Sequence, residues 1–489
     1  MRHIVGNYNY KITLEKSLPP LKRIHFIGIG GIGISALARY FLSQGYYVSG
    51  SDISSSDITN ELKKDGINIY IGHKSKNISK LNEFVVYSAA IPKNNPELRT
   101  ALNLKIPIKS YAQSLGELTR KYKTIAVSGT CGKSTTTAML SLVFIKAGFD
   151  PNVIIGTKLK EFNSSANGTN FKKGKDRYLI IEADEHFKSF LNYSPFAAII
   201  TNIDRDHLDF YKNLNNLKNT FLNFIKNISS GGILVVNKDD KNLFSLNIKI
   251  KKIAQKNKLK IYWYSITLNR RSSAQCNKIK KILKVPGKHN ISNAMAVYTM
   301  ARAFNIKDND IFNALGRYKG AWRRMEYRGN LKSQILNLKN IPIYDDYAHH
   351  PSKIKAALAG FREKYPKSKI ICVFQPHQIQ RLKYLFKEFT NSFNDADNLI
   401  LLDVFKVKGR DKSPSDINSE KLAGTIKNLP VGKQGRKSSL TVLYLKNSNN
   451  LKKEIENIIA LSLKLYPLNF IIIMMGAGDI YKMTDNLIK

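Results

Sequence analysis

Short apolar runs recur along this chain, each followed by a polar loop and then by a segment whose apolar residues have helical spacing. The first run, Arg23–Ile27, leads through several glycines into Ile34–Leu42, where the apolar residues fall on one face of a helix. Strands that alternate with helices pair in parallel, because each helix returns the chain to the same end of the sheet. The pattern therefore predicts an α/β protein built on parallel sheets.

The predicted strands form three series along the sequence. They are 23–27, 46–49 and 84–88; then 124–128, 178–182, 197–201 and 233–236; then 342–344, 370–374, 399–402 and 470–474. The basic stretch Thr119–Lys123 is predicted to be a linker, and the lysine-rich segment 241–284 shows no regular pattern. A chain of 489 residues is too long for one ordinary core. We predict three domains: a Rossmann-like N-terminal domain (1–121), a central P-loop ATPase-like domain with a parallel sheet (122–323) and a Rossmann-like C-terminal domain (324–489).

The charge balance adds a question about partners, because 79 Lys and Arg face only 36 Asp and Glu. Such an excess suits nucleic acid or an anionic membrane. The lysines are scattered through helices and loops without a basic tail, which favours a solvated basic surface or an anionic small substrate. The N-terminus has no apolar core of a secretory signal, and the longest apolar run, Phe470–Met475, is too short to cross a bilayer. We expect a soluble cytoplasmic protein without a membrane or nucleic-acid partner.

A glycine-rich loop at Gly28–Gly33 satisfies G-x-G-x-x-G between a predicted strand and helix, and Asp52 ends the second strand. Glycines let the backbone approach a diphosphate, and the following helix offers N–H donors. Asp52 stands where an acceptor for a ribose hydroxyl is expected. Any diphosphate-linked nucleotide fits this arrangement, NAD included, whereas a purely structural turn does not account for strand, helix and acid together.

A second loop, Gly129–Thr136, follows an apolar strand and precedes the helical run Thr137–Phe144. It lacks the first glycine of a G-x-x-x-x-G-K-[ST] loop, because that position is Val127. Its backbone N–H groups, Lys133 and the Ser134 hydroxyl nevertheless suit phosphates and Mg²⁺. A chance G-K-S in a basic protein is the alternative, and the strand-to-helix placement disfavours it.

Carboxylates follow the next two strands. Glu182 ends an apolar strand, and the loop 201–209 holds His207 among three aspartates. Because Mg²⁺ prefers oxygen ligands, Glu182 is a candidate metal ligand. His207 either ligates a second metal or pairs with a carboxylate, and a purely structural histidine is the alternative.

Polar residues in the later part of the chain supply further candidates. Asn290 and Asn293 are three apart on one helical face, where two amides suit a base edge, although Asn290 also suits a helix cap. The pair Arg323-Arg324 suits a phosphoryl group, or is simply solvated. The loops 345–351 and 374–381 both follow strands, where open α/β sheets bind ligands, and together contain His349, His377 and Arg381. These side chains suit a carboxylate or an amine, and a capped turn explains the Asp and Pro residues equally well.

Taken in order, these motifs resemble those of the Mur ligase family over nearly the whole chain. The motifs are the loop at Gly28, the G-T-x-G-K-[ST]-T-T loop, Glu182–Glu185, Thr201–Asp209, His289-Asn290 with Asn293, Asp345–Pro351, Phe374–His377 and Gly476–Asp479. Their spacing is most similar to the members that join L-alanine to UDP-N-acetylmuramate. The resemblance implies ATP-dependent amide formation through an acyl phosphate, in peptidoglycan precursor synthesis, with ATP and two Mg²⁺ ions.

The resemblance also implies a role for each candidate residue. Catalysis falls to Lys133, Glu182, His207 and His349, and the metal ligands are Ser134, Glu182 and His207. The implied ATP-binding residues are Gly129, Thr130, Gly132, Lys133, Ser134, Thr135, Asn290, Asn293, Arg324 and Asp346. The implied UDP-sugar-binding residues are Gly28, Gly30, Gly31, Gly33, Asp52 and Ser88. The implied amino-acid-binding residues are His349, His377 and Arg381.

Three positions depart from the family pattern. Members usually carry His where this chain has Cys131 and Thr where it has Ser134, and the hydroxyl needed for metal ligation is kept. Members usually carry Arg where this chain has Gln378. Losing one charged contact to a carboxylate weakens binding by about 1.5–3 kcal/mol if nothing replaces it.

Three other functions are compatible with parts of the sequence. Lys319–Glu326 also resembles the family members that attach a recycled murein peptide. The basic charge alone would suit a non-catalytic protein that binds nucleotides or nucleic acid. A nicotinamide-dependent dehydrogenase would account for Gly28 to Asp52 but not for the lysine loop or the metal carboxylates.

Overall fold

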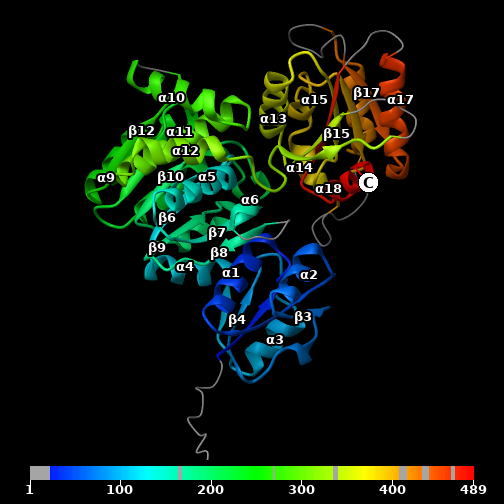
Figure 1. Cartoon of the computed structure of the whole chain (residues 1–489). Coiled ribbons are helices and arrows are strands. Elements are labelled where there is room, and N and C mark those ends of the chain that lie inside the picture. The colour runs from blue at the N-terminus through cyan, green and yellow to red at the C-terminus, as the bar shows by residue number, and fades with distance from the viewer. Residues whose placement is uncertain are drawn as a thin grey trace, which may run out of the picture. The chain divides into compact units, whose positions relative to one another are not determined.

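A computed structural model describes residues 22–162, 168–267, 270–333, 340–406, 416–431, 440–463 and 469–488 (Figure 1). The chain divides into two compact units, residues 1–111 and 112–489. In the part of the chain that the structure describes, the first unit contains one sheet and the second unit contains two. The predicted α/β class with three predominantly parallel sheets is confirmed. Within the described residues, no helix is both long enough and apolar enough to cross a membrane.

The first unit is a five-stranded parallel sheet in the order β3-β2-β1-β4-β5. Its strands are β1 (Arg23–Ile27), β2 (Tyr47–Asp52), β3 (Asn68–Ile71), β4 (Asn82–Tyr87) and β5 (Ile108–Ser110); its helices are α1 (Ile32–Ser43), α2 (Asp57–Lys64) and α3 (Pro96–Asn103). The strand order reverses between β1 and β4, and open sheets bind ligands at such a reversal. The glycine loop follows β1 and lies at this point.

A buried carboxylate lies inside the first unit. Glu97, at the start of α3, is fully buried and accepts hydrogen bonds from Ser51 Oγ and Asn77 Nδ2, with His73 Nδ1 at 3.2 Å. Burial acts to raise the pKa of Glu97, but its contacts with His25, Ser51 and Asn77 outweigh burial and lower that pKa below its usual 4.5. The folded unit therefore favours the ionised carboxylate.

Replacing Glu97 by glutamine is expected to destabilise the first unit by about 1–3 kcal/mol at pH 7, because buried donors lose a charged acceptor. A depressed folded pKa contributes stability that is complete above pH 4.5 and is lost as the pH falls through the folded pKa. The variant should therefore lose less stability under acid than the parent. Hydrogen exchange of the β1 and β2 amides, compared at equal pH, measures both effects; equal protection of parent and variant at pH 7 would contradict this expectation.

The polar stretch predicted to be a linker is helical instead. Residues 119–121 form the last turn of α4 (Tyr111–Lys121), and Lys123 opens the next strand. The helix buries Leu115 and Leu118, and its basic last turn is favourable beside the negative end of the helix dipole. The linker prediction was wrong because a polar, basic helix end looks like a linker when its buried face is ignored.

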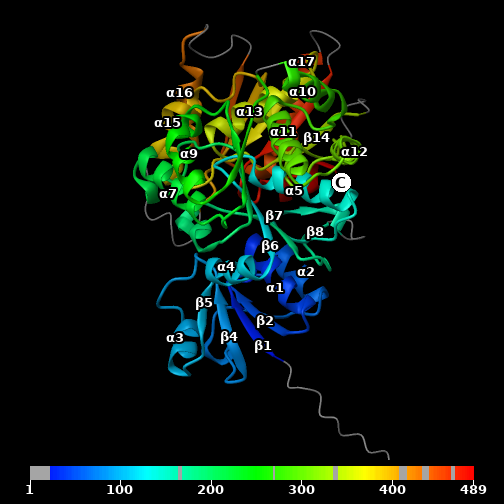
Figure 2. The ribbon, with the colours of Figure 1, turned by 90° about the vertical axis from the view of Figure 1, so that its left-hand side faces the viewer.

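The second unit begins with a seven-stranded sheet in the order β12-β11-β10-β6-β9-β7-β8, parallel except for β8. The strands are β6 (Lys123–Ser128), β7 (Asn152–Leu159), β8 (Thr169–Lys172), β9 (Tyr178–Glu182), β10 (Ala197–Ile200), β11 (Ile233–Asn237) and β12 (Lys260–Tyr264). The helices are α5 (Lys133–Lys146), α6 (Leu208–Tyr211), α7 (Leu214–Lys226), α8 (Lys241–Phe244), α9 (Asn247–Lys256), α10 (Arg270–Ile282), α11 (Lys288–Ala303) and α12 (Asp308–Arg317). Helix α5 packs against α11 and α12 (Figure 1 and Figure 2). The segment 241–284, which had no sequence pattern, supplies α8, α9, the edge strand β12 and α10.

A six-stranded sheet completes the second unit, in the order β13-β14-β18-β15-β16-β17, parallel except for β13. The strands are β13 (Glu326–Asn330), β14 (Pro342–Asp346), β15 (Lys369–Phe374), β16 (Asn398–Leu402), β17 (Thr441–Leu445) and β18 (Phe470–Met475). The helices are α13 (Pro351–Lys364), α14 (Ile379–Tyr384), α15 (Phe386–Thr390), α16 (Ser419–Lys427), α17 (Leu451–Leu463) and α18 (Ile480–Ile488). Alternate residues of β15 pack into two cores, one under α13 and one under α17 and α18. Helices on both faces explain why the central strands are continuously apolar.

Candidate functional site

The glycine loop of the first unit lies against Asp52 and Ser88, as the sequence predicts for a single site. The Gly30 N–H donates to Asp52 Oδ2 over 2.8 Å, and Oδ1 of the same carboxylate accepts from the Ile53 N–H. A Cβ atom placed on Gly28 would lie 3.1 Å from the Ser88 Cβ. The other loop glycines are Gly31, which precedes α1, and Gly33 in its first turn. Asp52 therefore fixes the backbone of the loop.

The loop between β6 and α5 is held by the loop that follows β10. Val127 belongs to β6, paired with Glu182 on one side and Ile199 on the other. The Cys131 N–H donates to Asn202 Oδ1 (2.9 Å), and Cys131 O accepts from Thr201 Oγ1 (2.6 Å). These contacts fix the loop backbone, and sequence reasoning did not assign this role to Thr201 or Asn202.

Other contacts complete the support of the loop. The Thr130 hydroxyl accepts from the Asp204 N–H (3.0 Å), and Asn293, on α11, lies directly over Gly132. A Cβ atom on Gly132 would be 2.4 Å from Asn293 Oδ1, and Gly132 has φ +84°. Burial raises the pKa of the Cys131 thiol, so the thiol stays protonated and unreactive. This agrees with a role for Cys131 as a small side chain that only fills space in the loop. Thr135 is buried in the first turn of α5.

Lys133 lies among carboxylates at the start of α5. Its Nζ donates to Gly129 O (2.8 Å) and Glu185 Oε2 (2.7 Å) and lies 3.4 Å from Asp184 Oδ1. Burial acts to lower the pKa of Lys133, but the charges of Glu185, Asp184 and Glu182 raise that pKa above its ordinary value. Lys133 is therefore a fixed positive charge at the loop.

Ser134 and Glu182 meet beside this lysine, as predicted for two ligands of one metal. Ser134 Oγ donates to Glu182 Oε1 over 3.0 Å, and Glu182 Oε2 accepts from the Gly156 N–H over 2.9 Å. Within the described residues, no group of three or more His, Cys, Asp or Glu side chains forms a metal site by itself. A hydroxyl and a carboxylate oxygen next to a phosphate loop nevertheless fit Mg²⁺, which is held by one or two carboxylates together with phosphates and waters.

His207 lies next to Glu185. Its ring stacks on His186 with centroids 3.9 Å apart, and its Nε2 is 3.9 Å from Glu185 Oε1, a buried atom without a hydrogen-bond partner in the described structure. Burial lowers the pKa of His207 to about 4, so the imidazole is neutral and has a lone pair for a metal. Ser134 and Glu182 thus form one candidate ligand group, and His207 beside Glu185 forms the other.

The two asparagines of α11 face different neighbours. Asn290 Nδ2 donates to Pro286 O over 2.7 Å and contacts the Met325 sulfur at 3.5 Å, whereas Asn293 lies on the loop at Gly132. The N-cap residue of α11 is Gly287, without a side-chain capping bond, so Asn290 does not cap the helix.

The Arg323–Met325 segment is anchored by Asp346. Asp346 Oδ2 accepts from the Met325 N–H (2.9 Å), and Oδ1 accepts from the Ala348 N–H (2.8 Å). Arg323 is buried and donates to Gly476 O, whereas the Arg324 guanidinium lies 4.6 Å from the centre of the Tyr347 ring. Asp346 therefore positions Arg324 through the backbone of its neighbour.

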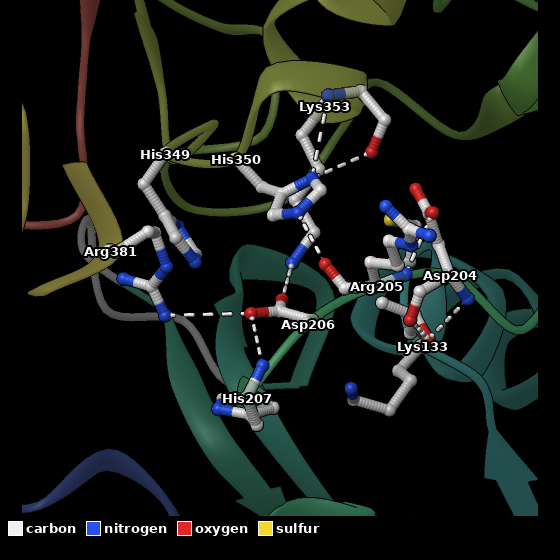
Figure 3. A network of polar contacts seen from close by, with 12 residues as sticks. Lys133, Asp204, Arg205, Asp206, His207, His349, His350, Lys353 and Arg381 are labelled. Carbon is white, nitrogen blue, oxygen red and sulfur yellow. Dashed lines mark hydrogen bonds and ion pairs between the residues drawn. The ribbon is translucent and has the colours of Figure 1, made fainter. Parts of the chain in front are cut away.

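His349 and Arg381 lie where β14 and β15 end (Figure 3), and His377 lies beside both of them. The two imidazole centroids are 6.1 Å apart, His349 Nδ1–H donates to Tyr347 O (2.8 Å), and an Arg381 Nη1–H donates to His377 O (3.3 Å). Burial holds the pKa of His349 well below its usual range, so His349 is neutral. The structure thus brings these three side chains together, and their binding of an amino acid stays a prediction.

Asp206 joins this histidine and arginine group to the loop after β10, a contact that sequence reasoning missed. Its Oδ1 lies 3.6 Å from Arg381 Nη2, and its Oδ2 lies 3.2 Å from Lys353 Nζ (Figure 3). His350 Nε2–H donates to Arg205 O over 2.7 Å. Burial acts to raise the pKa of Asp206, but the charges of Lys353 and Arg381 hold it well below its usual range. The sequence signal was limited to the charged run Asp204–His207 and to a lysine that closely follows the His349-His350 pair.

Comparison with known proteins identifies the family. Three family models match: "Mur ligase family, catalytic domain" over residues 23–123, "Mur ligase middle domain" over 127–301 and "Mur ligase, glutamate ligase domain" over 323–478. These models cover most of the chain, and the chain belongs to the Mur ligase family.

Curated relatives match over nearly their full length. The chain is 40% identical over 485 residues to the UDP-N-acetylmuramate–L-alanine ligase of Acetivibrio thermocellus, with 96% of each chain covered. It is 36% identical over 483 residues to the enzyme of that name from Clostridium perfringens, covering 96% of this chain and 98% of the relative.

Solved structures share the fold. The UDP-N-acetylmuramate-alanine ligase of Thermotoga maritima has a TM-score of 0.72 and 24% identity, covering 95% of this chain and 98% of its own. A murein peptide ligase from Psychrobacter arcticus has a TM-score of 0.61 and 21% identity, with the same coverage.

Proposed function

We propose that this protein joins L-alanine to the lactyl carboxylate of UDP-N-acetylmuramate, with conversion of ATP to ADP and phosphate, as a step of peptidoglycan precursor synthesis. The observation that carries the proposal is the 40% identity to the A. thermocellus L-alanine ligase over 96% of both chains. The Lys133 loop and the Ser134–Glu182 pair supply the groups that such a reaction needs.

The proposed reaction proceeds in two steps. The sugar carboxylate attacks the γ-phosphorus of ATP, which forms an acyl phosphate and releases ADP. The amine of L-alanine then attacks the acyl carbon, and phosphate leaves the tetrahedral intermediate as the amide forms. Both steps bring anions together, so catalysis rests on positioning and charge neutralisation. Lys133 would hold the β- and γ-phosphates, and neutral His349 would orient the incoming amine.

Mg²⁺ is the proposed cofactor, with two ions in the complete site. Ser134 and Glu182 would hold one ion, and His207 would contribute to a second. Bound there, Mg²⁺ supplies a Lewis acid that neutralises phosphate oxygens. The oxygen donors at the first position and the neutral imidazole at the second support this assignment.

Replacing Glu182 by glutamine is expected to raise the Mg²⁺ concentration for half-maximal activity roughly tenfold or more, since one charged ligand is lost. The exposed Glu363 on α13 gives a matched Glu363→Gln control, which should need no more Mg²⁺ than the parent. Mn²⁺ titration followed by electron paramagnetic resonance counts the ions. An unchanged Mg²⁺ requirement in Glu182→Gln would remove Glu182 from the metal site.

The remaining binding roles follow the same proposal. The UDP-sugar would lie on the loop of the first unit, with Gly28, Gly30, Gly31, Gly33, Asp52 and Ser88. ATP would contact Gly129, Thr130, Gly132, Lys133, Ser134, Thr135, Asn290, Asn293, Arg324 and Asp346. His349, His377 and Arg381 would surround the amino acid. We also propose domain boundaries at residues 121/122 and 323/324, which the three separate sheets support. We further propose that the protein is cytoplasmic and has no nucleic-acid partner.

An amino-acid panel tests the function. Purified protein with Mg²⁺, ATP and UDP-N-acetylmuramate is offered alanine, glycine, serine or a murein tripeptide separately, and phosphate release is measured. Alanine should give the highest kcat/KM. Release with the tripeptide alone would favour the murein-peptide ligase function, the second candidate, which the sequence at Lys319–Glu326 resembles. Without release for any single amino acid, the proposed function fails.

A further inference from the structure

A buried carboxylate separates two cations in the group around His349. Asp206 has only 3% of its surface exposed, and its two oxygens face different cations, Arg381 and Lys353. Lys353 comes from the first turn of α13 and Arg381 from α14, the helices that follow β14 and β15 of one sheet (Figure 3). Both cationic side chains are themselves largely buried.

Lys353, Arg381 and Asp206 together carry two positive charges and one negative charge. Asp206 balances one of the two cations that it contacts, and buried His349 and His350 are uncharged at neutral pH because burial lowers the pKa of each. Positive charge that is withdrawn from water is costly unless it is paired, so the arrangement favours the entry of one more anion. A carboxylate fits, because it can accept hydrogen bonds from two cations at once.

The position of the charges matches the proposed amino-acid site. Lys353 and Arg381 follow the carboxyl ends of β14 and β15, where open α/β sheets bind ligands. Gln378 carries no charge, and its backbone at φ +68° donates its N–H to Phe405 O. A second cation for a substrate carboxylate must therefore come from another residue, and Lys353 shares the Asp206 carboxylate with Arg381.

We infer that Lys353 and Arg381 together bind the α-carboxylate of the amino-acid substrate, with Asp206 holding the two cations in place before the substrate arrives. This inference rests on the proposed ligase function. Lys353 thereby determines specificity for a free amino acid over an analogue without a carboxylate. Losing one charged contact lowers affinity roughly 10- to 100-fold.

The test compares Lys353→Met and Lys353→Arg with Lys355→Met, a control at an exposed lysine two residues along the same helix. Lys353→Met should raise the KM for L-alanine roughly 10- to 100-fold and leave the KM values for ATP and UDP-N-acetylmuramate unchanged. Lys353→Arg should restore most of the affinity. Lys355→Met should match the parent.

L-alaninamide separates carboxylate recognition from a structural effect, because this analogue keeps the amine and lacks the charge. The parent should prefer L-alanine over L-alaninamide, and Lys353→Met should lose most of that preference. A second variant, Lys353→Met with Gln378→Arg, should recover part of the affinity for L-alanine. If the parent uses L-alanine and Lys353→Met keeps both its KM and its preference, the inference is wrong while the ligase function stands. If the parent protein does not use L-alanine, the proposed ligase function itself is wrong.

Discussion

Lys133→Ala is expected to lower ligase turnover by roughly 1000-fold or more, because electrostatic stabilisation is the main source of catalysis in phosphoryl transfer. Lys133 is the fixed positive charge of the loop and touches Gly129 O, Glu185 and Asp184. Without it, the γ-phosphate loses its cation and two carboxylates face the incoming triphosphate. ADP formation with UDP-N-acetylmuramate and L-alanine present measures the loss.

Two controls accompany the Lys133 variant. Lys146→Ala removes an exposed lysine from the last turn of the same helix and should keep full activity. Lys133→Met retains most of the side-chain volume, so equal inactivity of the methionine and alanine variants assigns the effect to charge. Thermal unfolding checks that both variants fold, since removing the cation from the buried Glu185 carboxylate costs stability. A folded Lys133→Met protein with more than a tenth of parental turnover would contradict the assigned role.

Gly129→Ala is expected to abolish measurable ATP binding, with the Kd rising about 100-fold or more. A Cβ atom at Gly129 would lie 2.1 Å from Thr201 Oγ1, and the residue has φ +138°. The loop must then move away from Thr201. That movement breaks the hydrogen bonds of Cys131 with Thr201 and Asn202, which hold the loop N–H groups in position. A shift of about 1 Å at a catalytic group is enough to cost about 100-fold.

Gly148→Ala gives a matched control for backbone strain. Gly148 also has positive φ (+87°), but a Cβ atom there would meet nothing within 4 Å. This variant should lose about 1 kcal/mol of stability and bind ATP normally. Isothermal calorimetry with a non-hydrolysable ATP analogue compares the two, and equal affinities would show that crowding at Thr201 is not what fixes the loop.

The strands and the loop positions were predictable because local patterns determine them. Val127 belongs to β6, so the shortened loop begins at Gly129. Long apolar runs such as Phe470–Met475 are strands buried on both faces, which a sequence pattern shows directly. The family predicted from the ordered motifs is confirmed by three matching models.

The missed features depend on contacts between distant segments. The amphipathic pattern of α9 and α10 was hidden because lysines occupy so many of the exposed positions in 241–284. Asp206 and Lys353 form an ion pair although they are far apart in sequence. The motif around each residue does not indicate that the two side chains meet. The individual roles of the site residues stay predictions until the variants are measured.

The internal ion pairs of Lys133 have a consequence for selectivity among cellular anions. An anion that binds Lys133 must replace the contacts of that lysine with Glu185 and Asp184. Its net binding free energy is therefore the difference between the new charged interaction and the ones that it replaces. Inorganic phosphate, which offers one phosphoryl group and no adenosine, gains little from that exchange. A triphosphate has further phosphates and a base with which to offset the exchange. With ATP bound at this loop as proposed, the competing carboxylates would raise the affinity that small anions need in order to inhibit the enzyme.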